Sequence, residues 1–157
     1  DDESTTEGTS DEEPDILPAP DFTVENALGE EVMLTDFVGK PIVLNFWASW
    51  CGPCKNEMPD FQTVYDTYGA DVVFLMVNMT DGSRETKETA MAFSEEQQYT
   101  FPVYYDVEQE AAYAYYVTSV PVTYFIDTEG YVAAYGQGSL KQETILEGLE
   151  MLGVTTK

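Results

Sequence analysis

Two apolar runs of strand length, separated by one amphipathic segment, dominate the first half of the chain. Residues 41–48 (PIVLNFWA) and residues 72–79 (VVFLMVNM) are almost continuously apolar and rich in β-branched or aromatic side chains. Such runs are typical of central strands that are covered on both faces. Between them, residues 55–68 carry apolar side chains at spacings of three or one, which predicts a helix with one apolar face. A strand, a helix and a strand in this order predict a right-handed parallel crossover.

Shorter segments, with turn signals between them, predict the remaining elements. Residues 22–34 (FTVENALGEEVML) are expected to form two short strands around a turn at Leu28 and Gly29, before a turn or short helix that ends at Gly39. The later elements are expected to be a helix at 84–98, a strand at 101–106, a helical segment at 108–116, a β-hairpin from 121–127 and 131–136, and a final helix at 140–152. The sequence therefore predicts an α/β fold whose central mixed sheet is flanked by helices.

The length of 157 residues and the hydrophobic content of 43% suit one globular domain. The first fifteen residues contain eight acidic residues, no basic residue and no large apolar side chain. Such a segment cannot bury enough apolar area to offset its ordering entropy. We therefore expect an acidic disordered tether at 1–16 and a folded domain at 17–157. No stretch approaches the roughly 18 to 20 uninterrupted apolar residues of a membrane span.

Acidic residues outnumber basic residues by 30 to 6 and histidine is absent, so the net charge is −24. Nucleic acid is not expected as a partner, because phosphate binding needs clustered Lys and Arg. The missing histidine excludes Cys-His and Ser-His-Asp catalysis. Two cysteines alone cannot supply the four ligands of a structural zinc site, so neither a metal nor another cofactor is expected. The acidity is expected to reflect a solvated, self-repelling surface rather than a dedicated cation or partner site. A salt-rich habitat is a further explanation that stays open.

The only two cysteines, Cys51 and Cys54, directly follow the first apolar run. A disulfide that closes so short a loop stabilises a fold by only about 2 kcal/mol, which is a weak reason for this spacing. At the end of a strand and the start of a helix, free backbone N–H groups favour a thiolate and lower its pKa. Cys51 precedes the helix and is expected to face solvent as the attacking nucleophile, with Cys54 covered one turn later as the resolving thiol. Gly52 and Pro53 suit the first helical turn between them.

At these residues the chain resembles the thioredoxin superfamily, whose signature is W-C-G-P-C after a hydrophobic strand. Three further features are similar: Pro59 stands where the family has a helix proline, residues 118–121 (TSVP) match its cis-proline loop, and residues 121–127 match the strand that follows. The resemblance extends over residues 22–153.

Within that superfamily, IVLNFWASWCGPCKNEMP and the leading hairpin are similar to the extracytoplasmic, membrane-tethered reductases of the TlpA/ResA type. The spacing between Cys54 and Pro121 leaves room for an extra strand-helix unit around residues 85–105. The resemblance therefore implies a thioredoxin-like fold with an N-terminal β-hairpin and an inserted strand-helix unit.

The resemblance also assigns a role to Glu57, because this branch often carries a glutamate three residues after its second cysteine. Asn45 stands where cytoplasmic thioredoxins have a buried acid that shuttles the proton of the resolving cysteine. Glu57 could accept that proton from Cys54 instead. It could equally be an exposed first-turn acid that the helix dipole favours. Asn45 is expected to be a core amide with its hydrogen bonds satisfied.

The resemblance further implies a substrate-binding edge around the cysteine pair. Pro121 is expected to follow a cis peptide bond, which presents the backbone of Val120 to a substrate strand, whereas an X-Pro bond without the resemblance is expected to be trans. Trp50 and Pro53 are expected to form an apolar rim that suits an extended polypeptide. Trp47 is a second candidate for the rim but is first assigned to the core. A cluster of tyrosines is expected to be core and rim packing rather than a ligand site: Tyr104, Tyr105, Tyr113, Tyr115 and Tyr116.

These features predict a thiol-disulfide oxidoreductase that uses the Cys51–Cys54 dithiol/disulfide couple and no cofactor. The Gly-Pro dipeptide resembles that of reductants, and the resemblance implies protein disulfide substrates among exported proteins and a membrane thiol electron donor of CcdA/DsbD type. It also implies a monomer outside the cytoplasm, with the acidic segment as a spacer between a lipid anchor and the domain. A cytoplasmic thioredoxin stays an alternative, since a catalytic pair survives in either compartment.

Two other functions compete with this prediction. Peroxiredoxins share the scaffold, but their peroxidatic cysteine usually has a threonine three residues upstream and an assisting arginine. Ala48 occupies that upstream position, and Arg84 is the only arginine in the chain. A non-enzymatic binding module is the third possibility, and insulin reduction with the wild type and the Cys51→Ser variant separates it from the enzymes.

Overall fold

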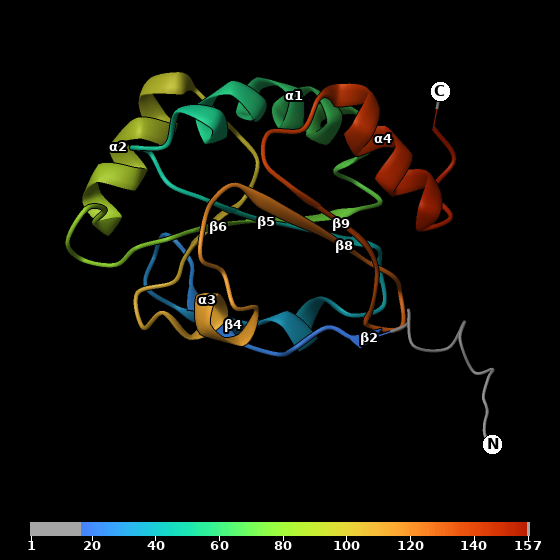
Figure 1. Cartoon of the computed structure of the whole chain (residues 1–157), viewed down its shortest axis with the longest axis horizontal. Helices are drawn as coiled ribbons and strands as arrows, with labels where there is room; N and C mark the ends of the chain where they lie inside the picture. Colours follow the sequence, from blue (N-terminus) through green and yellow to red (C-terminus); the bar gives the residue numbers. More distant parts are fainter. Residues whose placement is uncertain (1–16, 157) are drawn as a thin grey trace, which may run out of the picture.

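The computed structural model describes residues 17–156, which form one mixed sheet with helices on both faces (Figure 1). The expected tether at 1–16 lies outside the described residues. Among residues 17–156, no helix is both long and apolar enough to cross a bilayer. The elements are β2 Leu17–Pro18, β3 Thr23–Glu25, β4 Glu31–Met33, the 3-10 helix η2 Leu34–Phe37, β5 Ile42–Trp47, α1 Gly52–Tyr68, β6 Val73–Asn78, α2 Lys87–Gln97, β7 Val103–Tyr105, α3 Glu110–Ala114, β8 Val122–Ile126, β9 Tyr131–Gln137 and α4 Gln142–Met151.

The sheet has the strand order β2-β9-β8-β5-β6-β7-β3-β4. Strand β5 runs parallel to β6 and antiparallel to β8, so the predicted mixed sheet and parallel crossover are confirmed. The predicted hairpin of β8 and β9 and the leading hairpin of β3 and β4 are also present. In this register Asn45, in the middle of β5, lies between Met76 of β6 and Thr123 of β8.

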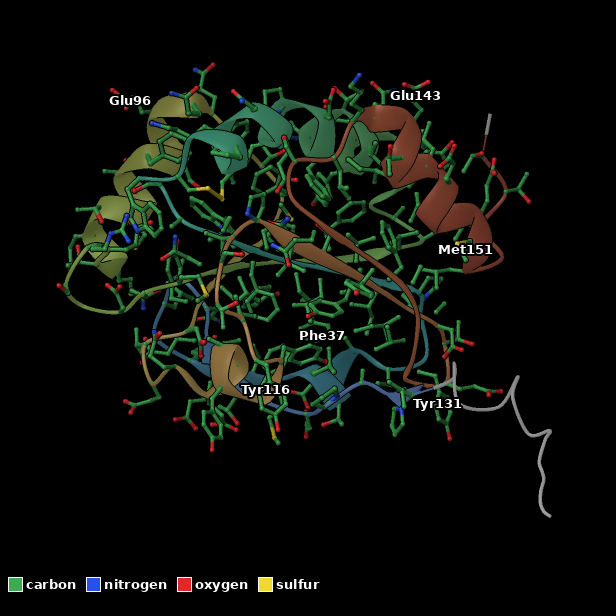
Figure 2. All side chains as sticks on the ribbon, viewed as in Figure 1. Phe37, Glu96, Tyr116, Tyr131, Glu143 and Met151 are labelled. Atoms are coloured by element: carbon green, nitrogen blue, oxygen red, sulfur yellow. A yellow bond between two sulfur atoms is a disulfide. The ribbon has the colours of Figure 1, made fainter. Side chains whose placement is uncertain are left out.

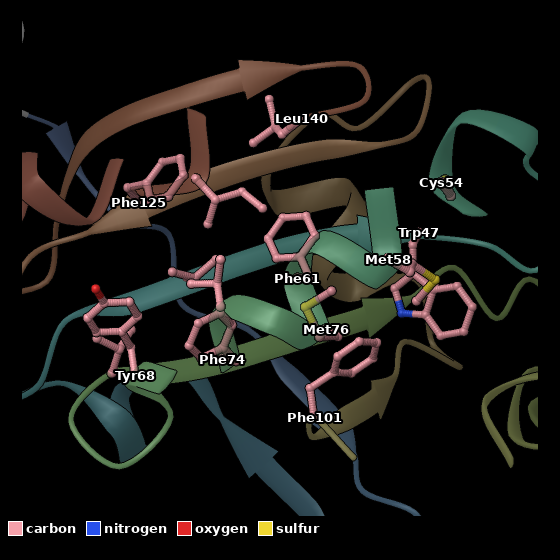
Figure 3. Packing of buried hydrophobic residues seen from close by; sticks show 14 of the residues in the cluster. Trp47, Cys54, Met58, Phe61, Tyr68, Phe74, Met76, Phe101, Phe125 and Leu140 are labelled. Carbon is pink, nitrogen blue, oxygen red and sulfur yellow. The ribbon is translucent and has the colours of Figure 1, made fainter. Parts of the chain in front are cut away.

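Strand β5 is buried along its whole length because the sheet is covered on both faces. Helices α1, α2 and α4 lie on one side of the sheet, and α3 lies on the other with the β3–β4 hairpin (Figure 1). Successive β5 side chains point to opposite faces, so Val43 and Trp47 enter the cluster under α1 while Ile42, Leu44 and Phe46 enter the other cluster. Figure 3 shows Trp47 inside the α1 cluster, which confirms its assignment to the core.

Helix α1 begins at Gly52, three residues before the amphipathic segment at 55–68 that predicted it. The reason is local, because the sulfur of Cys51 accepts the N–H of Cys54 and Cys51 itself becomes the N-cap. The predicted apolar face packs on the sheet through Met58, Phe61, Val64 and Tyr68. Pro59 lies inside the helix, as the resemblance implied.

Two local predictions need correction, and one short strand was missed. Helix α2 begins at Lys87 rather than near 84, because Thr86 caps it and exchanges hydrogen bonds with Thr89. Strand β2 was not predicted, since it has only two residues and exists through its pairing with β9. Packing is also the wrong assignment for Tyr113 and Tyr116, which are 82% and 85% exposed on either side of the C-terminal end of the five-residue helix α3.

Candidate active site

The cysteine pair lies at the junction between the end of β5 and the start of α1, as expected from the sequence. Cys51 and Cys54 form a disulfide, with their Cα atoms 5.2 Å apart. Figure 2 shows the bond between the two sulfurs above the sheet, at the first turn of α1. The backbone N–H of Cys54 lies 3.1 Å from the sulfur of Cys51, and the first turn of α1 carries no acidic residue. This environment stabilises negative charge on the sulfur of Cys51.

The two cysteines differ in accessibility, but less than expected. Cys51 is 4% exposed and Cys54 is fully buried. The expectation that Cys51 faces solvent is therefore wrong for this oxidised form. Its sulfur lies 3.7 Å from the carbonyl oxygen of Val120, and the residue joins the apolar cluster under α1. Cys51 is still the only one of the pair with any accessible surface.

The loop opposite the cysteines contains the expected cis peptide bond between Val120 and Pro121. Pro121 itself is buried, so its neighbour Val120 supplies the backbone that faces Cys51. Trp50 is 41% exposed and Pro53 is exposed, which places both on the surface around the cysteine pair. The structure thus places Trp50 and Val120 along one hollow beside the cysteine pair, with Pro53 exposed in the first turn of α1.

Glu57 is fully buried beneath the cysteine pair, so its interpretation as an exposed first-turn acid is wrong. It lies three residues after Cys54, on the same inner face of α1. Its carboxylate accepts hydrogen bonds from the Asn45 side-chain amide at 2.8 Å and from the Leu140 backbone N–H at 3.1 Å. Burial raises the pKa of Glu57 to about 7, although both hydrogen bonds act in the opposite direction. A carboxyl group with this pKa exchanges protons near neutral pH.

Asn45 connects Glu57 to the centre of the sheet. Its Nδ2 also donates to Thr123 Oγ1 at 3.0 Å, across the register of β5 and β8. Its Oδ1 has no hydrogen-bond partner within residues 17–156. The expectation of a satisfied core amide is therefore confirmed for the nitrogen and wrong for the oxygen. A turned amide would offer Oδ1 to a protonated Glu57, so Asn45 can bind either protonation state.

A second buried glutamate, Glu85, supports the loop before Cys51 and was missed in the sequence analysis. Its carboxylate accepts the backbone N–H and the hydroxyl of Ser49, both at 2.6 Å. It also accepts the Asn78 side-chain amide at 2.7 Å and the Thr89 hydroxyl at 2.9 Å. These bonds join the end of β5 to β6 and α2. The only signal in the sequence is an acid next to the capping Thr86, which does not reveal burial.

Replacing Glu85 by alanine is expected to destabilise the fold by about 2 kcal/mol, because Ser49 and Asn78 lose a buried acceptor. Glu85→Gln keeps one oxygen as an acceptor for these donors, so its free energy of unfolding should fall by roughly half as much. Urea unfolding at pH 7 measures both, with Glu95→Ala on the exposed face of α2 as the control. A Glu85→Ala variant as stable as Glu95→Ala would contradict this structural role.

Arg84 lies beside the site but points its charge at an aromatic ring. Its guanidinium carbon is 3.5 Å from the centre of the Trp50 ring, a cation–π contact. Ala48, in the position where peroxiredoxins usually have a threonine, is buried. Within residues 17–156, no cluster of three or more His, Cys, Asp or Glu side chains could hold a metal ion.

The sequence pattern of the AhpC/TSA family matches residues 17–135. The chain belongs to the AhpC/TSA family. The chain is similar to the thiol-disulfide oxidoreductase ResA of Geobacillus thermodenitrificans. The two are 37% identical over 135 residues, which cover 85% of this chain and 75% of ResA.

Solved structures agree with this assignment. StoA of Bacillus subtilis is 28% identical, with a TM-score of 0.72 over 85% of this chain and 98% of StoA. The exposed lipoprotein thioredoxin Etrx1 of Streptococcus pneumoniae is 31% identical, with a TM-score of 0.72 over 83% of this chain and 98% of Etrx1. The comparisons confirm the thioredoxin-like fold and the predicted thiol-disulfide oxidoreductase activity of this AhpC/TSA family member.

Proposed function

We propose that Cys51 is the attacking nucleophile and Cys54 the resolving thiol of a protein disulfide reductase. In the reduced form, the Cys51 thiolate attacks one sulfur of a substrate disulfide and expels the other as a thiolate. Cys54 then loses its proton and attacks the Cys51 sulfur, which releases the second substrate thiolate. Two electrons pass to the substrate, and the chain is left with its Cys51–Cys54 disulfide.

The observation that carries this proposal is the unequal placement of the two sulfurs. Cys51 is the N-cap of α1, where the Cys54 N–H already points at its sulfur, and it retains some accessible surface. Cys54 is fully buried inside the first turn. A substrate disulfide can therefore approach only the sulfur of Cys51, which the helix N-terminus favours as a thiolate.

We assign Glu57 as the proton acceptor for Cys54. The two residues share the inner face of α1, one turn apart, and no water-exposed base can reach a thiol that is fully buried. A carboxyl group with a pKa of about 7 is deprotonated often enough to accept the proton and basic enough to hold it. Asn45 holds the carboxylate in place from β5.

The substrate-binding edge is assigned to Trp50, Pro53, Val120 and Pro121. Trp50 and Pro53 expose apolar surface next to Cys51 in the chain, and the Val120 carbonyl lies 3.7 Å from the Cys51 sulfur. An extended polypeptide with a disulfide could pair with the Val120 backbone while its sulfur meets Cys51. This arrangement supports protein disulfides as substrates.

The proposed setting is outside the cytoplasm, with exported proteins as substrates and a membrane thiol donor of CcdA/DsbD type supplying electrons to a monomeric enzyme. The similarity to a protein described as an exposed lipoprotein thioredoxin supports an extracytoplasmic, lipid-anchored form. Protease treatment of intact cells tests the location: degradation is expected, and full protection until lysis would contradict it.

Equilibration with glutathione buffers tests the reducing direction. We expect a midpoint potential of about −250 mV or lower, which is the range of reductants such as thioredoxin. The fraction of oxidised protein is measured by thiol alkylation and mass spectrometry. A potential near the value of about −120 mV that is typical of strong oxidants would reverse the direction of the proposed reaction.

A further inference from the structure

A continuous groove leads from the rim of the cysteine pair to α3, on the opposite side of the sheet from α1. One part, of about 140 Å³, is bordered by Trp50, Arg84 and Val120. The other part, of about 590 Å³, is bordered by Tyr113 and Tyr116. Both parts share the same three wall residues, Gln109, Val117 and Thr118, so the surface around Cys51 continues without interruption to α3.

The far part of the groove exposes two large aromatic rings that the fold does not use. Within residues 17–156, neither Tyr113 nor Tyr116 stacks on another ring, and neither hydroxyl has a hydrogen-bond partner. By contrast, Tyr115 between them is buried and its hydroxyl donates to the carbonyl of Pro20. Figure 2 shows Tyr116 beside α3 at the molecular surface. Adjacent exposed aromatics of this kind are a common feature of binding surfaces.

The backbone holds Tyr116 in a conformation that an aromatic residue seldom adopts. Its φ angle is +52°, in the left-handed region that favours glycine or asparagine. A backbone hydrogen bond holds this conformation, since the Tyr116 N–H donates to the carbonyl of Tyr113. The strained backbone and the exposed ring of Tyr116 do not stabilise the fold. Both features are consistent with a binding role.

The charge of this part of the groove specifies the kind of partner. Its charged wall residues are Glu108 and Glu110, both exposed, and its lining includes no basic residue. The nearest cation that borders the groove is Arg84, in the other part and engaged with Trp50. Tyrosine faces next to carboxylates bind Lys and Arg side chains through cation–π contacts and charge pairing. The net charge of −24 attracts the same partners at long range.

We propose that the groove binds a basic segment of the substrate protein, in which Lys or Arg residues lie several positions from the reactive cysteine. The inference rests on the proposed function, because the segment docks while its disulfide meets Cys51. Beside the disulfide, the charges of Arg84 and Asp81 balance each other, whereas the far part has two carboxylates and no cation. The basic residues therefore belong farther along the chain, over Tyr113 and Tyr116. The groove thus selects basic protein disulfides over neutral or acidic ones.

The test uses three peptides whose single cysteine is disulfide-linked to a small neutral thiol. They differ only at positions four to six on both sides of the cysteine, which carry Lys, Ser or Glu and lie roughly 13–20 Å away in an extended chain. Each kcat/KM is divided by the same protein's rate on hydroxyethyl disulfide, which has no flanking chain. The wild type is expected to prefer the Lys peptide over the Ser peptide about fivefold, with the Glu peptide slowest.

Matched variants separate the groove from the overall charge. Tyr113→Ser/Tyr116→Ser and Glu108→Gln/Glu110→Gln are each expected to remove most of the preference for the Lys peptide. Glu95→Gln/Glu96→Gln, on the exposed side of α2, makes the same change in net charge. This control variant is expected to keep the preference for the Lys peptide. An equal loss in both glutamine pairs, or a preference that survives the loss of both tyrosines, would overturn the proposal.

The same assays distinguish failure of the groove from failure of the enzyme assignment. A wild type that does not reduce hydroxyethyl disulfide would refute the proposed function without testing the groove. In that event, a Lys peptide with serine in place of cysteine is titrated and followed by NMR. Amide shifts at residues 108–118 in the wild type, but not in Tyr113→Ser/Tyr116→Ser, would support docking, and shifts elsewhere or none would overturn it.

Discussion

Replacing Cys51 by serine is expected to lower kcat/KM for the reduction of protein disulfides by about 10³-fold or more. The chain has only two cysteines, and the remaining one, Cys54, is fully buried behind the first turn of α1. A serine hydroxyl cannot form the mixed disulfide, so no alternative nucleophile takes over. Losses of this size are typical when an enzyme loses its covalent nucleophile. Insulin reduction followed by turbidity provides the measurement.

The fold of this variant is expected to persist, which keeps the result interpretable. Serine is a good N-cap, so its hydroxyl can replace the sulfur as acceptor for the Cys54 N–H. Thermal unfolding compares Cys51→Ser with the reduced wild type, because both lack the disulfide. A folded Cys51→Ser protein that retains more than about a tenth of the activity would show that the cysteine pair is not the reaction centre.

Replacing Glu57 by glutamine is expected to stabilise the fold by about 3 kcal/mol more at pH 8 than at pH 4. Burial raises the pKa of Glu57 from 4.5 to about 7, so between these values the folded state binds a proton that the unfolded state has released. The wild type therefore loses stability as the pH rises from about 4.5 to 7, and the loss stays constant above that range. Glutamine does not ionise and escapes this loss.

The measurement is the free energy of unfolding in urea at a series of pH values, with both proteins in the disulfide form. The difference between variant and wild type cancels the titration of the many surface carboxylates. Glu96→Gln, at an exposed position near the end of α2, is the matched control and should show a small difference at all pH values (Figure 2). A Glu57→Gln difference that stays flat between pH 4 and 8 would mean that Glu57 has no raised pKa.

The same substitution tests the proposed catalytic role through a separate readout. In the wild type, release of a preformed mixed disulfide should accelerate with an inflection near pH 7, as Glu57 becomes able to accept the Cys54 proton. In Glu57→Gln the release should be slower and the inflection absent. An unchanged pH profile would limit Glu57 to a structural role, even if its effect on stability is as expected.

The central strands and the cysteine site could be predicted from sequence because their signals are local. The continuous apolar run of β5 requires cover on both faces, and the C-x-x-C that follows it lies at a strand-to-helix junction for any such fold. The cis bond at Pro121 was predicted only through the family resemblance, since X-Pro bonds are mostly trans.

The remaining features depend on tertiary contacts that no local pattern encodes. Glu57 is buried because α1 turns its side chain toward Asn45 and the Leu140 backbone. Both of these partners come from distant parts of the chain. Glu85 is buried because its carboxylate replaces water for Ser49 and Asn78. A glutamate is normally assigned to the surface from sequence, so the burial of both residues became visible only in the structure.

Trapping of the mixed disulfide tests the central claim most directly. Reduced Cys54→Ser and Cys51→Ser proteins are mixed with an excess of a peptide disulfide, and intact mass spectrometry follows adduct formation over time. Cys54→Ser should rapidly form a stable one-to-one adduct on Cys51, while Cys51→Ser stays unmodified on the same timescale. Equal adduct formation by both variants, or faster formation on Cys54, would contradict the assignment of Cys51 as the attacking sulfur.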